Sequence, residues 1–207
     1  MCDFHLPREL KIKPSPWGPD DQIGRLNWIT DASRQKVMEA LDPSKSYDVS
    51  VKYFMGMPSW SAAGDPPFQI WMTHTPTGNV NDGLLNVSLT GKKLIGYSGD
   101  AISMYTHCGT HIDTLNHFGY QDQVWNGYNQ AEHLGSRHWM KCGAEQFPII
   151  CARAILLDVA KAKGVDRLPP SYGIGKEDLQ LAMSLQNVSI EQGDIVMIRT
   201  GMMTVWP

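Results

Sequence analysis

Apolar side chains recur at helical spacing in two parts of the chain, residues 31–41 and 176–186. Thr30 or Asp31 can cap the first of these segments, and Pro43 ends it. The spacing predicts two helices that each bury one face. The predicted inward positions are Val37, Met38 and Leu41 in the first and Leu179, Ala182, Met183 and Leu185 in the second.

Shorter apolar runs predict strands. Residues 47–54 alternate between apolar and polar side chains, as a half-buried strand does, while residues 151–159 and 195–198 are almost continuously apolar, as buried strands are. Glycine and proline are frequent over residues 57–83, which predicts a long irregular loop. Its aromatic side chains favour a functional role, such as a lid over an aromatic substrate, with surface packing as an equal alternative. Strands separated by helices predict an α/β fold with a mixed sheet.

The chain of 207 residues is long enough for one sizeable core. Residues 1–24 are rich in proline and polar side chains and predict an extended arm. We therefore expect an N-terminal arm and helix over residues 1–43, followed by a single domain over residues 44–207. The cysteines are irregularly spaced, which favours reduced thiols in a cytoplasmic protein. They are Cys2, Cys108, Cys142 and Cys151.

Composition narrows the range of partners. A net charge of −3 without a run of Lys or Arg gives no electrostatic footprint for nucleic acid. No apolar stretch approaches the length of a membrane span, and the first residues lack a hydrophobic signal core. Neither the Gly-x-Ser-x-Gly turn of serine hydrolases nor a phosphate-binding loop occurs. We expect a cytoplasmic protein with a small-molecule substrate and with no nucleic-acid or membrane partner.

The densest group of metal-binding and proton-transferring side chains begins at His107 and ends at His117, in the order His-Cys-Gly-Thr-His-Ile-Asp-Thr-Leu-Asn-His. Neutral imidazole and carboxylate suit zinc, manganese or iron, so His107, His111 and Asp113 are candidate metal ligands. His117 is a candidate acid–base near neutral pH. The cluster indicates a metal-dependent hydrolase.

The spacing of the two first histidines requires a bend. An extended strand would separate His107 and His111 by about 13 Å, at about 3.3 Å per residue, which is too far for two imidazoles on one ion. Gly109 is the residue between them that can adopt unusual dihedral angles, so we expect a strand, a tight turn fixed by Thr110, and a second short stretch. Cys108 excludes the His-Glu-x-x-His helix of zinc proteases, and we expect it to be a small buried side chain rather than a nucleophile.

Residues 107–118 resemble the signature His-x-Gly-Thr-His-x-Asp-x-Pro-x-His-Phe of the cyclase family, which includes kynurenine formamidase and isatin hydrolase. Leu115 stands where many members have proline, a change that removes no chemical group. The likeness runs from about Trp17 to Pro207. Its weaker pieces are, in order, Trp17–Gly24, Leu26–Asn27, Trp125–Gly127, Leu156–Val159, Gly193–Asp194 and Arg199–Gly201.

The resemblance implies the swivelling β/β/α fold of that family, with His107, His111 and Asp113 as metal ligands and His117 as the catalytic acid–base. It implies zinc or manganese as the cofactor and the hydrolysis of an aromatic amide, formamide or lactam by metal-activated water. The arylformamidase reaction of tryptophan catabolism is of this type. It also implies a homo-oligomer, and Trp71 as a wall of the substrate pocket.

Family members of this type resemble longer chains, with further metal and catalytic residues in their C-terminal part, so we expect this chain to be cut short relative to them. Two alternatives to a hydrolase stay open: an inactive relative that binds a metal or a ligand, and a metal-dependent cyclase or dehydratase acting on another substrate. Some further side chains could complete the metal sphere, although surface or packing roles are more typical of them: His74, Glu132, His133, His138 and Glu145.

Overall fold

A computed structural model describes residues 11–83 and 97–207. The chain divides into two compact units, one made of residues 1–46 and 113–206 and the other of residues 47–112 together with Pro207. In the described part of the chain, no helix combines the length and apolar character needed to cross a membrane. The domain boundary predicted after residue 43 stays a prediction.

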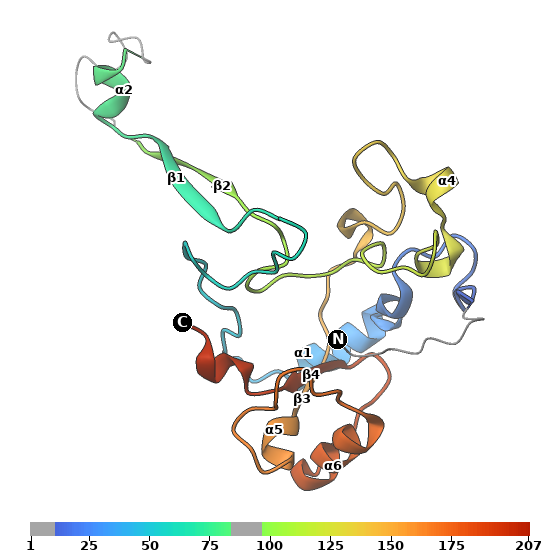
Figure 1. The fold of residues 1–207 in the computed structure, drawn as a ribbon. Helices are drawn as coiled ribbons and strands as arrows, with labels where there is room; N and C mark the ends of the chain where they lie inside the picture. The colour runs from blue at the N-terminus through green and yellow to red at the C-terminus, as the bar shows by residue number, and fades with distance from the viewer. Residues whose placement is uncertain (1–10, 84–96) are drawn as a thin grey trace. The chain divides into compact units, whose positions relative to one another are not determined.

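The first unit contains a parallel pair of strands, β3 (Ala154–Asp158) and β4 (Ile195–Arg199), with α5 (Val159–Ala162) and α6 (Lys176–Gln186) packed against them (Figure 1). These strands and the helix α6 confirm three predicted elements. Apolar side chains of β3, of the two helices and of the loop between the helices form a core. Its buried members are Leu157, Val159, Ala160, Leu168 and Ala182.

The predicted burial of β3 and β4 is only partly correct. Leu157 is completely buried, but its neighbour Leu156 is 47% exposed, and the apolar side chains of β4 are partly exposed. Helices cover one face of this two-stranded sheet, so alternate side chains of each strand keep contact with solvent. Leu185 was predicted to point inward and is instead 64% exposed, because it borders a surface hollow next to Leu156.

The predicted N-terminal helix is confirmed as α1 (Asp31–Ala40), after the 3-10 helix η1 (Gly24–Trp28). Thr30 caps α1. Its side-chain oxygen accepts a hydrogen bond from the Ser33 amide, and the Ser33 hydroxyl oxygen accepts one from the Thr30 amide. The predicted apolar face is not buried as a whole. Val37 is half-buried, whereas Met38 and Leu41 are exposed.

Residues 15–28 fold through turns against residues 124–128, which corrects the extended arm expected over residues 1–24 for this part of it. Residues 1–10 of that arm lie outside the described residues. The centre of this region is the buried carboxylate of Asp21, which accepts hydrogen bonds from Ser15 Oγ, Asn27 Nδ2 and Trp125 Nε1 at 2.7–2.8 Å. Burial acts to raise the pKa of Asp21, but the hydrogen bonds outweigh it and hold this pKa below its ordinary value. Trp125 belongs to the short element η2 (Trp125–Gly127), which α4 (Gln130–His133) and η3 (Ala144–Gln146) follow along the chain.

The second unit contains an antiparallel ribbon of β1 (Gln69–His74) and β2 (Gly99–Ser103), with the short helix α2 (Gly78–Asn81) after β1 (Figure 1). The irregular loop predicted over residues 57–83 is therefore wrong in part, because it contains β1 and α2. The strand predicted over residues 47–54 is also wrong. Its backbone is held by side-chain hydrogen bonds rather than by a β-ladder. With antiparallel and parallel sheets among its helices, the chain has the predicted α/β class.

Candidate metal centre

The histidine-rich segment follows β2 after three intervening residues and bends at Gly109, whose φ of +59° lies in the left-handed region. The predicted turn at this glycine is confirmed. Thr110 fixes it differently from the expectation: its Oγ1 accepts a hydrogen bond of 2.9 Å from the amide of Val51, far away in the sequence. Cys108 is buried, as predicted, and its thiol donates to the carbonyl of Tyr105 at 3.2 Å.

Three of the predicted site residues come together. His107, Asp113 and His117 each offer a ligand atom, and these atoms all lie within 4.8 Å of one another. His107 is half-buried, while Asp113 and His117 are exposed. Ligand atoms bound to one tetrahedral zinc at about 2.1 Å stand about 3.4 Å apart, so this group needs a local rearrangement of about one to one and a half ångströms to hold an ion. Two imidazoles and one carboxylate are a donor set that fits zinc or manganese.

His111 lies beside this group without being part of it. Its ring packs edge-on to the ring of His107, with the two centroids 4.9 Å apart. Its Nδ1 is 3.0 Å from the carbonyl oxygen of Gly109, and because a carbonyl only accepts, Nδ1 carries the proton. The lone pair of His111 is therefore on Nε2, the tautomer in which a backbone carbonyl orients a metal-binding histidine.

A second turn presents His117. The amide of His117 donates to the carbonyl of Thr114 at 3.0 Å, and Asn116 anchors the turn through a hydrogen bond of 2.9 Å from its Nδ2 to the Lys141 carbonyl. Leu115, which occupies the position of the family's proline, packs against the buried cluster of Val124, Tyr128 and Cys142.

The remaining candidates stand apart from this group. Trp71 lies on β1 opposite Ala101 and is 49% exposed, so its role as a pocket wall stays a prediction, as do the metal-ligand and acid–base assignments. His74 packs edge-on against Tyr97, and His133 against Tyr128. Within residues 11–83 and 97–207, the three-ligand group of His107, Asp113 and His117 includes none of the further candidates.

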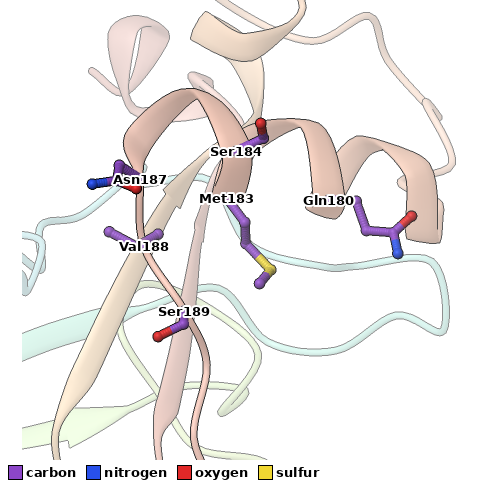
Figure 2. A pocket seen from close by; sticks show the side chains of 6 residues that line it. All are labelled: Gln180, Met183, Ser184, Asn187, Val188 and Ser189. Atoms are coloured by element: carbon purple, nitrogen blue, oxygen red, sulfur yellow. The ribbon is translucent and has the colours of Figure 1, made fainter.

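A separate hollow of about 520 Å³ lies at the end of α6 (Figure 2). Figure 2 shows six side chains from α6 and the residues after it, and none of them is charged or a strong metal ligand. They are Gln180, Met183, Ser184, Asn187, Val188 and Ser189. The chemistry of this hollow gives no reason to place a reaction there.

Comparisons with known proteins relate this chain to cyclases. A family model described as a cyclase matches residues 47–207. A crystal structure described as a novel cyclase is similar to this chain, with a TM-score of 0.78 and 28% sequence identity over 92% of the chain. The chain spans 61% of the length of that structure. None of the curated proteins matches it.

Proposed function

Because the chain belongs to the cyclase family, we propose that it is a metal-dependent hydrolase of the arylformamidase type, acting on an aromatic amide, formamide or lactam. The observation that carries this proposal is the convergence of His107, Asp113 and His117 within 4.8 Å, in a short segment with the family's characteristic order of residues. This group brings two of the proposed ligands, His107 and Asp113, together with His117, the proposed acid–base, and its exposed positions give a substrate access.

In this proposal His107, His111 and Asp113 hold the cation, zinc or manganese, and His117 transfers the proton. A bound divalent cation supplies Lewis acidity and lowers the pKa of a bound water toward neutrality. His117 accepts the proton that water loses as its oxygen bonds to the carbonyl carbon. The same ring then donates this proton to the nitrogen that leaves as the C–N bond breaks. Its position within 4.8 Å of two ligand atoms supports this role.

The first test is the metal content of the purified chain, measured by plasma mass spectrometry, together with hydrolysis of N-formylkynurenine by the same sample. We expect about one equivalent of zinc or manganese or more, and activity that a chelator removes. His107→Ala and Asp113→Ala should lose most of the metal, because each ligand belongs to a small set. His138→Ala, at an exposed histidine outside the group, is the matched control and should keep it.

Two further variants separate the roles of the other histidines. His117→Ala should retain the metal and lose turnover, and His111→Ala should lose the metal. The opposite pattern would make His117 the ligand and His111 the outer residue. Full metal retention in both the His107 and Asp113 variants would overturn the metal site. Metal without hydrolysis of any amide, formamide or lactam would favour a cyclase or dehydratase acting on another substrate.

A further inference from the structure

The backbone between His107 and His111 is held by one tyrosine. The hydroxyl of Tyr53 shares its proton between the carbonyls of Cys108, at 3.2 Å, and Thr110, which it approaches more closely. These carbonyls stand on either side of Gly109, the residue at which the segment bends. One side chain, more than fifty residues earlier in the chain, therefore fixes the direction of the peptide on both sides of the bend.

The ring of Tyr53 also lies against the glycine. A Cβ atom at position 109 would come within 2.8 Å of Tyr53 Cζ and 2.9 Å of Met57 Cε, distances that real Cβ atoms do not tolerate. Glycine is thus required here twice, by its positive φ and by the close approach of this ring. The contact places the hydroxyl where it reaches the two carbonyls.

Two more bonds from the same part of the chain complete the support. The amide of Val51 donates to Thr110 Oγ1 at 2.9 Å, and the amide of Trp60 donates to the carbonyl of His107 at 3.2 Å. The carbonyl of Gly109 accepts from His111 Nδ1. Each backbone carbonyl from position 107 to 110 therefore has a donor: Tyr53 or Trp60 serves three of them, and His111 itself serves the fourth.

We propose that Tyr53 is a positioning residue for the metal centre, one that sets the spacing of the imidazoles of His107 and His111 through the intervening carbonyls. This inference rests on the proposed metal-dependent function. Loss of the hydroxyl leaves the carbonyls of Cys108 and Thr110 to water and releases the peptide units that carry the two histidines. Binding of the ion must then also order this segment, and the entropy lost in doing so weakens the affinity for the metal.

Packing of the ring alone does not account for the hydroxyl. Tyr53 packs edge-on against the buried ring of Phe68, with centroids 5.6 Å apart, and a phenylalanine would make the same contact. Tyr53→Phe therefore removes the two carbonyl interactions and keeps the aromatic contacts with Phe68 and Gly109. Tyr47→Phe is the matched control, because Tyr47 is 82% exposed in the same segment.

The experiment is a titration of the full chain with Co²⁺ after removal of metal, followed by the visible absorption of the bound ion. Competition with a chelator gives the dissociation constant, and urea unfolding of the metal-free protein gives its stability. We expect Tyr53→Phe to bind Co²⁺ about tenfold more weakly, at the lower end of the effect of losing an outer partner, and to change the absorption spectrum. Thr110→Val, which removes the acceptor of the Val51 amide, should act in the same direction.

The outcomes distinguish this inference from the proposed function. If the unaltered chain binds no Co²⁺, both are wrong. If it binds Co²⁺ and Tyr53→Phe binds within twofold of it with the same spectrum, only the role of Tyr53 is overturned. The role of Tyr53 would also be overturned if Tyr47→Phe weakened Co²⁺ binding by the same factor. The same holds if urea unfolding showed that metal-free Tyr53→Phe is unfolded, because unfolding would then explain the weaker binding.

Discussion

The region of β3, α5, α6 and β4 and the turn around Gly109 are held in different ways. In the first, apolar side chains that are completely buried, such as Leu157 and Ala182, hold the elements together. In the second, backbone carbonyls accept hydrogen bonds from residues far away in the sequence, and most of the segment is exposed. Stability and metal binding are therefore expected to respond to different substitutions.

The largest expected effect on stability is that of Leu157→Ala. Removing a completely buried leucine side chain leaves a cavity, and the free energy of unfolding should fall by about 2–5 kcal/mol. Urea unfolding followed by tryptophan fluorescence measures this change. The metal content per folded molecule should stay unchanged, and a parallel loss of metal would show that the two regions are not independent.

Asp21→Asn should have the next largest effect, about 1–3 kcal/mol, because it removes an acceptor of several buried hydrogen bonds. The folded pKa of Asp21 is lowered, so the carboxylate stabilises the fold fully above its ordinary pKa and loses this contribution as the pH falls through the lowered value. The unfolding curves of the two proteins should thus differ at neutral pH and converge in acid. A difference that persists at low pH would contradict this explanation.

Gly109→Ala changes the histidine turn instead of the β3–α6 core, so it should affect metal binding more than stability. The left-handed backbone costs an alanine about 1–2 kcal/mol, and its Cβ collides with the ring of Tyr53. We expect a marked loss of bound metal together with a fall in the free energy of unfolding that is smaller than that of Leu157→Ala, both measured on one preparation. Gly173→Ala is the control, because its φ is ordinary and a Cβ there meets open space. Unchanged metal content in Gly109→Ala would mean that the bend is not needed for binding.

The smallest expected effect is that of Thr30→Ala, which removes the cap of α1 and costs about 1 kcal/mol. Since α1 contains no buried residue, the effect should stay within the helix, as faster hydrogen exchange of its first amides. Neither the unfolding of the β3–α6 core nor the metal content should change. A change in either would show that this exposed helix is coupled to the rest of the protein.

The same contrast explains which elements could be predicted from the sequence. The helix α6 carries its own apolar periodicity, so a short window of residues was sufficient to find it. The segment around Tyr53 alternates like a strand, but its partners are the carbonyls and the Thr110 hydroxyl of a turn over fifty residues later. The strand β1 was missed because glycine and proline flank it on both sides.

The candidate site shows the same division. The ligand types and the bend at Gly109 could be predicted, because both depend on residues within one short segment. The grouping of His117 with His107 and Asp113 could not be predicted, because it depends on how two successive turns fold. The periodicity of apolar positions does not single out Tyr53 or Asp21, because their partners are distant in the sequence. Tyr53 bonds to Cys108, 55 positions away, and Asp21 bonds to Trp125, 104 positions away.

The separation of Tyr53 from the turn that it supports also has a consequence for the order of folding. The interaction with Cys108 closes a loop of 55 residues, whereas Gln186 meets the backbone of β3 across only 28–30 residues. Loop-closure entropy grows with the length of the loop, and contacts between distant residues form slowly. The β3–α6 region should therefore acquire protected amides before the histidine turn does. A chain refolding from denaturant would pass through a state in which this core is formed and the histidine turn is not.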